Sequence, residues 1–327
     1  MNKKVLVTVV DPNNEILVAV AKPLLDAGMQ VDYNFLHHTQ DAQVVIDAAR
    51  GYDYVIAGSE IWNRAVLSQT VDKLKMLVRY GVGMDSVDIP AAIELGICVS
   101  NTPGANAHQV AEHQLGMVLC LVRNIAQYDY QMKNGIWSVV VTPSLEGIVG
   151  IVGLGAIGLA FAKLLQPFPV EIIAYDPYPN QKAKDSEIRF VPLEELMKSS
   201  DFVSLNLPCN DQTRGIIGKD MLSLMKADAY LINTSRGGVI DQDALVDVLR
   251  SKRIAGAALD VFEQEPISPD DPLTKLDNVV LTPHSASAST SGLHSVFSRC
   301  VRNILDFEAG KVFDGLFNPE CLENFKK

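Results

Sequence analysis

The sequence predicts an α/β fold with two doubly wound parallel sheets, one in each of two domains. Apolar runs of strand length alternate with helical patterns along most of the 327 residues, and this alternation is typical of parallel sheets. A glycine-rich stretch, "GIVGLGAIG" (150–158), begins a second series of such units in the middle of the chain. A chain of this length accommodates about two domains.

The first series supplies the elements of a small α/β domain. Helical patterns such as "NNEILVAVAKPLLDAG" and "IPAAIELG" separate its apolar runs and end at a glycine, which commonly terminates helices. The predicted strands of this series are 4–10, 30–36, 52–58, 74–80 and 97–101.

Residues 107–135 predict one long helix, because they contain no proline and a single glycine before the last position. The middle of this segment is apolar nearly all round, which predicts burial on more than one side. We therefore expect it between domains or in a subunit interface, with the face around Leu115, Val118 and Val122 as the dimer contact.

The second series continues to the C-terminal part of the chain and ends with a helical pattern over 288–310. The arrangement predicts one domain formed by 1–101 and 291–327, with a second domain of 102–290 inserted into it. The chain would then cross between the domains twice, as in a hinge. The predicted strands of the second series are 147–153, 171–176, 201–208, 229–235, 255–261 and 278–283.

Composition excludes several classes of partner. The formal charge of −11, from 39 acidic and 28 basic residues, argues against nucleic acid or an anionic membrane surface. The uncharged stretch 147–162 is too short to span a membrane, and no His or Cys spacing indicates a metal site. Five scattered cysteines without a C-x-x-C pair, and an N-terminus typical of a first strand, predict reduced thiols in a cytoplasmic protein.

Gly153, Gly155 and Gly158 have the spacing G-x-G-x-x-G between a predicted strand and a predicted helix. In a Rossmann domain these glycines allow a tight turn, close approach of a diphosphate, and close helix–strand packing. The helix N-terminus then favours the anion. Asp176 ends the next strand, where a carboxylate accepts hydrogen bonds from ribose hydroxyls and repels a 2′-phosphate, so NAD is favoured over NADP. The alternative is a domain of this type with a degenerate turn.

Arg236, Glu265 and His284 each follow a predicted strand of the second series, where ligands bind in open α/β sheets. Taken singly, each is more readily interpreted as an ordinary loop residue. Together they supply what hydride transfer to a 2-keto acid requires. Histidine donates the proton, a carboxylate fixes its tautomer and stabilises its charged form, and arginine holds the substrate carboxylate at two points.

The chain resembles the D-isomer-specific 2-hydroxyacid dehydrogenases, whose motifs occur in family order, whereas residues 1–70 match only in general pattern. The matching stretches are "RYGVGMDSVD" (79–88), "NTPGANAHQVAEHQLG" (101–116), "GIVGLGAIG", "LINTSRGGVIDQDAL" (231–245), "AALDVFEQEP" (257–266) and "LTPHSASAS" (281–289).

The resemblance implies a Rossmann NAD-binding domain inserted into a flavodoxin-like substrate-binding domain, and a homodimer. It makes Arg236, Glu265 and His284 the catalytic set. It implies that the substrate binds at Arg79 and at the backbone N–H groups of Gly81, Val82 and Gly83, although Arg79 is equally expected to shape the glycine loop. The implied NAD contacts, besides the three glycines of the turn, are Ala156, Ile157, Asp176, Leu207, Pro208, Thr234, Asp260 and His284.

The motifs are most like those of D-3-phosphoglycerate dehydrogenases without the C-terminal regulatory domain, but two positions depart from them. Gly58, in "VIAGSE", stands where those enzymes commonly carry an arginine for the substrate phosphate, and Ala156 replaces a frequent arginine of the fingerprint. The expected reaction is NAD-dependent interconversion of a D-2-hydroxy acid and its 2-keto acid. D-3-phosphoglycerate, hydroxypyruvate and glyoxylate remain open as substrates. The alternative function is an NAD(H)-sensing, corepressor-like binding protein on the same fold.

Overall fold

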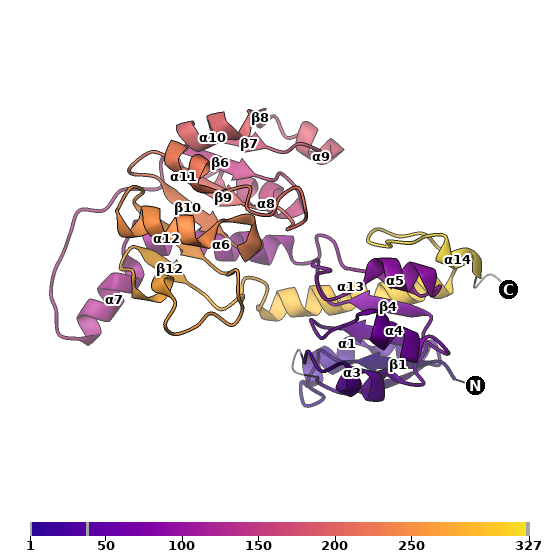
Figure 1. The fold of residues 1–327 in the computed structure, drawn as a ribbon. Helices are drawn as coiled ribbons and strands as arrows, with labels where there is room; N and C mark the ends of the chain where they lie inside the picture. Colours follow the sequence, from indigo (N-terminus) through magenta and orange to yellow (C-terminus); the bar gives the residue numbers. More distant parts are fainter. Residues whose placement is uncertain (1, 37–38, 325–327) are drawn as a thin grey trace. The chain divides into compact units, whose positions relative to one another are not determined.

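The computed structural model describes residues 2–36 and 39–324. It divides into two compact units. The first runs from the start of the described chain to Asn106 and resumes at Ser289, and the second is Ala107–Ala288. Both units are α/β with parallel sheets, so the predicted fold class is confirmed (Figure 1).

The first unit is built on a five-stranded parallel sheet with the order β2-β1-β3-β4-β5. This is the flavodoxin-like order, in which the chain winds outward in both directions from the junction of β1 and β3. The strands are β1 (Lys4–Val7), β2 (Gln30–Tyr33), β3 (Tyr54–Ala57), β4 (Met76–Arg79) and β5 (Cys98–Ser100).

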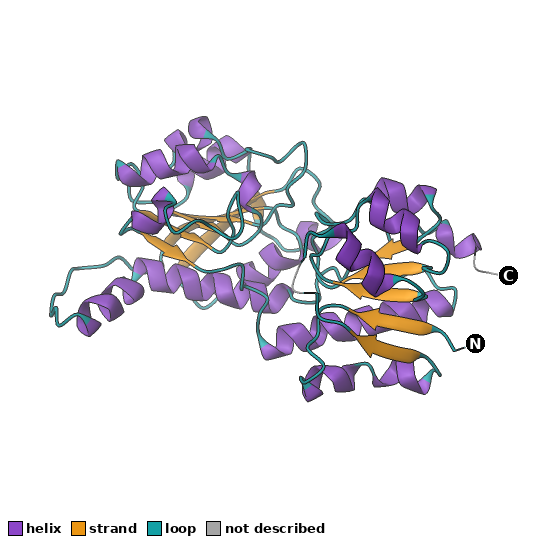
Figure 2. Cartoon of the chain, turned by 60° about the horizontal axis from the view of Figure 1, so that its bottom comes forward, coloured by secondary structure: helices purple, strands orange, loops and turns teal. Residues whose placement is uncertain are grey.

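Helices cover both faces of this sheet (Figure 2), because side chains alternate between faces along each strand. Val5 and Val7 join one hydrophobic core and Leu6 joins the other. The first core packs against α1 (Glu15–Val20), α2 (Lys22–Asp26) and α13 (Thr290–Glu308). The second packs against α3 (Ala42–Ala49), α4 (Arg64–Thr70) and α5 (Ile89–Glu94).

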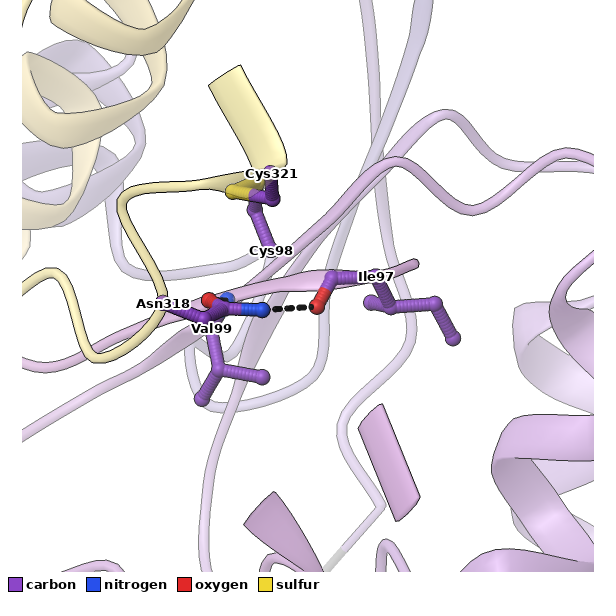
Figure 3. Close-up of a disulfide and its surroundings, with 5 residues drawn as sticks. All are labelled: Ile97, Cys98, Val99, Asn318 and Cys321. Carbon is purple, nitrogen blue, oxygen red and sulfur yellow. Dashed lines mark hydrogen bonds between the residues drawn. A yellow bond between two sulfur atoms is a disulfide. The ribbon is translucent and has the colours of Figure 1, made fainter. Parts of the chain in front are cut away.

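Residues 315–321, which we term the C-terminal strap, run along the outer edge of β5. Phe317 N donates to Val99 O at 3.0 Å, and the Asn318 side chain bonds both Ile97 O and Val99 N at 2.9 Å. The strap ends at Cys321, the first residue of α14 (Cys321–Asn324), which forms a disulfide with Cys98 (Figure 3).

The prediction that all five cysteines are reduced is therefore wrong for Cys98 and Cys321. Their Cα atoms lie 5.6 Å apart, a separation that a disulfide spans. Their 223-residue separation in the sequence gives no local signal of this pairing. Cys120, Cys209 and Cys300 are free thiols.

The second unit contains a seven-stranded parallel sheet with the order β12-β11-β10-β9-β6-β7-β8. From β6 outward this is the Rossmann order with one further strand. The two-residue strand β8 at its edge has no counterpart among the predicted strands. The strands are β6 (Gly147–Val152), β7 (Val170–Tyr175), β8 (Arg189–Phe190), β9 (Phe202–Leu205), β10 (Tyr230–Asn233), β11 (Gly256–Leu259) and β12 (Val279–Leu281).

Two helical layers cover this sheet as well. One core packs it against α6 (Ala107–Val122) and α8 (Ala156–Leu165). The other core packs it against the short helices α10 (Leu193–Ser199), α11 (Lys219–Leu224) and α12 (Gln242–Arg250). A further short helix, α9 (Gln181–Lys184), follows β7.

The predicted long helix is two helices, α6 and α7 (Ile125–Lys133), because Asn124 adopts a left-handed backbone with φ of 56°. The predicted dimer face is also wrong. Val118 and Val122 are 2% and 1% exposed, and with Leu115 they pack in the core between α6 and α8. The side chains of Val118 and Val122 are buried inside their own unit, so they are not available to a second subunit.

Within the described residues, no helix is long and apolar enough to cross a membrane. Residues 2–36 and 39–324 also contain no group of three or more His, Cys, Asp or Glu side chains that could hold a metal ion.

Candidate active site

The glycine turn lies between β6 and α8, and its shape requires glycine at two positions. Gly153 has φ of +92°, and a Cβ there would come within 2.7 Å of Asn206 O. A Cβ at Gly158 would come within 2.4 Å of Gly153 O. At Gly155, the N-cap of α8, a Cβ would meet nothing within 4 Å, and no side chain caps the helix. The N-terminus of α8 is therefore shaped to receive a diphosphate.

Asp176 follows β7 and lies against this turn. Its Oδ2 accepts a hydrogen bond from Leu154 N at 3.0 Å, and its Oδ1 accepts one from Tyr178 N at 2.8 Å. Both bonds hold the carboxylate beside the diphosphate position, where it is suited to the ribose hydroxyls of NAD.

The other expected NAD positions follow the carboxyl ends of neighbouring strands. Leu207 and Pro208 follow β9, where Leu207 is buried and Pro208 is exposed. Ala156 and Ile157 are the first two residues of α8. Thr234, directly after β10, is 8% exposed, and its Oγ1 has no hydrogen-bond partner in the described part of the chain. Buried hydroxyls are nearly always satisfied, so this atom fits a site that binds a polar ligand such as the cofactor.

His284 and Glu265 are directly paired, with 2.6 Å between His284 Nδ1 and Glu265 Oε2. Phe262 N also donates to Glu265 Oε1 at 3.0 Å. Burial is the largest single influence on the Glu265 pKa and raises it. The hydrogen bonds from His284 and Phe262, with the charges of His284 and Arg236, outweigh burial and hold the pKa below its usual range. An ionised Glu265 only accepts, which makes Nδ1 the donor and leaves Nε2 for the reaction.

Arg236 follows β10 and lies close enough to Glu265 for its charge to affect the pKa of that carboxyl. Its Nη1 donates to Ser235 O at 2.6 Å, and its carbonyl accepts from Asn233 Nδ2 at 2.9 Å. Next to it, a Cβ at Gly237 would lie 1.9 Å from the carbonyl carbon of Phe262. This close backbone approach brings the Arg236 segment to the loop that carries Glu265.

Asp260 has a role that sequence reasoning missed. Its expected contact with NAD stays a prediction. In addition, its fully buried carboxylate accepts from Thr282 Oγ1 at 2.5 Å, Ser285 N at 2.8 Å and Ala286 N at 2.9 Å. These bonds fix the turn in which His284 has φ of +50°, a conformation that is uncommon outside glycine. Asp260 therefore sets the direction of the His284 side chain.

His113 joins this network from α6. Its Nε2 lies 3.1 Å from Thr282 Oγ1 and 3.6 Å from Asp260 Oδ1. The sequence placed His113 on a helix beside Glu112 but gave no signal of its partners, because Thr282 and Asp260 follow strands more than 140 residues later.

The expected substrate loop follows β4 in the first unit. Gly81 has φ of +126°, so its place requires glycine. Its N–H donates to Thr102 Oγ1 at 3.1 Å, whereas Asn101 Nδ2 bonds Val82 O at 2.7 Å. Because the Gly81 N–H is already bonded, a substrate carboxylate at this loop would accept hydrogen bonds from the backbone N–H groups of Val82 and Gly83.

Arg79 itself donates from Nη1 to Tyr80 O. This bond turns the guanidinium onto its own loop and favours the interpretation that Arg79 shapes the loop over one in which it binds a phosphate.

Residues 115–286 match the family model described as "D-isomer specific 2-hydroxyacid dehydrogenase, NAD binding domain". The chain belongs to this dehydrogenase family. Its Rossmann unit is thus the NAD-binding domain of a D-2-hydroxyacid dehydrogenase, and the family resemblance inferred from the motifs is confirmed.

Relatives of this dehydrogenase cover most of its length. It is 37% identical over 289 residues to a glyoxylate reductase of Korarchaeum cryptofilum, covering 86% of this chain and 87% of that protein. It is 35% identical to a D-3-phosphoglycerate dehydrogenase of Archaeoglobus fulgidus, covering 83% of this chain and 52% of that protein. The apo-structure of D-lactate dehydrogenase from Escherichia coli superposes with a TM-score of 0.82 at 26% identity, covering 96% and 99% of the two chains.

Proposed function

We propose that this dehydrogenase interconverts a D-2-hydroxy acid and its 2-keto acid with NAD, using Arg236, Glu265 and His284. The observation that carries the proposal is the 2.6 Å contact between His284 Nδ1 and Glu265 Oε2 beside Arg236. A short, charge-assisted bond of this kind fixes the imidazole and leaves Nε2 to exchange a proton with substrate.

In the direction of reduction, Arg236 binds the carboxylate of the keto acid. The N–H groups of Val82 and Gly83 are a second proposed carboxylate-binding position. Bound NADH supplies the hydride for the carbonyl carbon. His284, protonated at both nitrogens, gives the Nε2 proton to the carbonyl oxygen as that oxygen becomes a hydroxyl. Glu265 stabilises the imidazolium before transfer and the Nδ1–H tautomer after it.

A panel of 2-keto acids with NADH tests this function by loss of the nicotinamide absorbance. We expect oxidation of NADH with at least one of glyoxylate, hydroxypyruvate, pyruvate and phosphohydroxypyruvate. NADH binding without oxidation on any member would contradict an enzyme and support an NAD(H)-sensing binding protein. The paired Glu265 and His284 disfavour that alternative, because a sensor needs no oriented proton donor.

We also propose a homodimer, now through residues 136–141, which we term the apolar arm. Trp137, Val139 and Val141 are 85%, 82% and 102% exposed. The arm is held in place, because Tyr128 Oη donates to Val140 O at 2.8 Å and accepts from Val140 N at 3.1 Å. Exposed apolar side chains on a fixed segment are typical of a subunit interface.

We propose the cytoplasm as the compartment, since the reaction uses soluble NAD(H).

Replacing Trp137 and Val141 together by aspartate is expected to convert the dimer to a monomer, because charges in an apolar contact are costly to bury. Light scattering coupled to size-exclusion chromatography measures the mass. Ile16→Asp, at a 64% exposed apolar position of α1, is the control and should stay dimeric. A double variant that keeps the mass of two chains would contradict the role of the arm.

A further inference from the structure

Glu60 is a buried carboxylate in the loop after β3, with 1% of its surface exposed. Its Oε1 accepts hydrogen bonds from Thr8 Oγ1 at 2.5 Å, Gly58 N at 3.0 Å and Trp62 Nε1 at 3.3 Å. All three donors are neutral groups. Three N–H or O–H groups directed at one oxygen suit a carboxylate, whose oxygens accept hydrogen bonds.

The place of this cluster in the sheet is one where ligands bind in similar folds. Thr8 follows β1 and Gly58 follows β3, and the order β2-β1-β3 makes the junction of these two strands the point where the winding direction reverses. Open α/β sheets bind ligands just beyond the strand ends at this point. Here three buried donors at this junction are directed at the protein's own carboxylate.

The same loop is joined to the expected substrate loop at both of its ends. Tyr80 N donates to Ala57 O at 2.7 Å, and Trp62 N donates to Ser86 O at 2.8 Å. Asp88 N in turn donates to Trp62 O at 3.0 Å. The Glu60 charge is therefore fixed beside the loop whose Val82 and Gly83 are proposed to hold the substrate carboxylate.

We infer that Glu60 determines substrate class, because its fixed negative charge excludes 2-keto acids that carry a second anionic group. A charge in a poorly solvated place acts over several ångströms, and Glu60 also occupies the donors a phosphate would need. Keto acids with a small uncharged substituent, such as glyoxylate and hydroxypyruvate, are then the substrates. This inference rests on the proposed function. It agrees with the presence of Gly58 in place of an arginine.

Hydroxypyruvate and phosphohydroxypyruvate test the inference, since they differ only by the phosphate. We expect the wild type to have a kcat/KM for hydroxypyruvate more than about tenfold above that for phosphohydroxypyruvate. Glu60→Gln keeps the side-chain shape and removes the charge. It should raise the ratio of kcat/KM for phosphohydroxypyruvate to kcat/KM for hydroxypyruvate about tenfold, mainly by lowering the KM for phosphohydroxypyruvate. Asp53→Asn is the matched control, because Asp53 is a 6% exposed carboxylate at the opposite end of the same strand; its ratio should not change.

A second measurement does not depend on turnover. With NADH saturating the cofactor site, inorganic phosphate should raise the Tm of Glu60→Gln more than that of the wild type. An unchanged substrate ratio in folded Glu60→Gln, or a wild type that uses both keto acids equally, would overturn the inference while leaving the proposed function intact. A wild type that reduces no keto acid would instead refute the proposed function, and the Tm shift would then decide the role of Glu60.

Discussion

His284→Ala is expected to lower kcat for keto-acid reduction by about a thousandfold, while the Kd of NADH changes little. Removal of a positioned general acid costs roughly 10²–10⁴ in rate. The turn that receives the diphosphate is formed by residues 153–158, so it keeps its shape without the His284 side chain. Steady-state kinetics gives kcat, and quenching of NADH fluorescence on titration gives the Kd.

His294→Ala is the control for this substitution, because His294 is an exposed residue of α13 whose Nδ1 is hydrogen-bonded to Ser298 Oγ. Its kcat should equal that of the wild type. A His284→Ala enzyme with undiminished turnover would remove His284 from the proton-donating role.

Glu265→Gln is expected to lower kcat about a hundredfold, because the amide has the size of the carboxylate but cannot stabilise the imidazolium. The amide can also present an N–H to Nδ1 and so favour the wrong tautomer. The nearby Glu263→Gln is the control, since Glu263 is exposed and its backbone N–H, not its carboxylate, donates to Gln242 Oε1. Equal rates for wild type and Glu265→Gln would show that the pair does not act in proton transfer.

The pH dependence of stability gives this substitution a second readout. Because the pKa of Glu265 in the folded protein lies below its usual value of 4.5, ionisation of Glu265 stabilises the fold above about that pH. This contribution is lost as the pH falls through the lower, folded-state pKa. Urea unfolding of wild type and Glu265→Gln should therefore give a stability difference that is constant near neutral pH and shrinks below about pH 4.5. A difference independent of pH would contradict the ionised pair.

The sequence predicted the parts of this protein that depend on local pattern. Alternating apolar runs predicted both parallel sheets, and the G-x-G-x-x-G spacing predicted the turn before α8. The contact of Glu265 with His284 follows a simple rule, since residues after successive parallel strands of one sheet lie at one edge.

Features that depend on distant partners could not be predicted. A left-handed residue at Asn124 ends α6 within an otherwise helical pattern. The buried positions of Asp260 and Glu60 depend on donors such as Ser285 and Thr8, at least 25 residues away in the sequence. No spacing rule connects such positions, because packing in three dimensions brings them together.

The disulfide between Cys98 and Cys321 closes residues 98–321 into a covalent ring. The inserted unit, Ala107–Ala288, lies wholly between these two cysteines. A single proteolytic cut anywhere in that unit therefore opens the ring without separating the pieces, and the two segments of the first unit stay tethered until the disulfide is reduced. After such a cut the disulfide-bonded molecule keeps its two pieces covalently joined, whereas the reduced molecule does not.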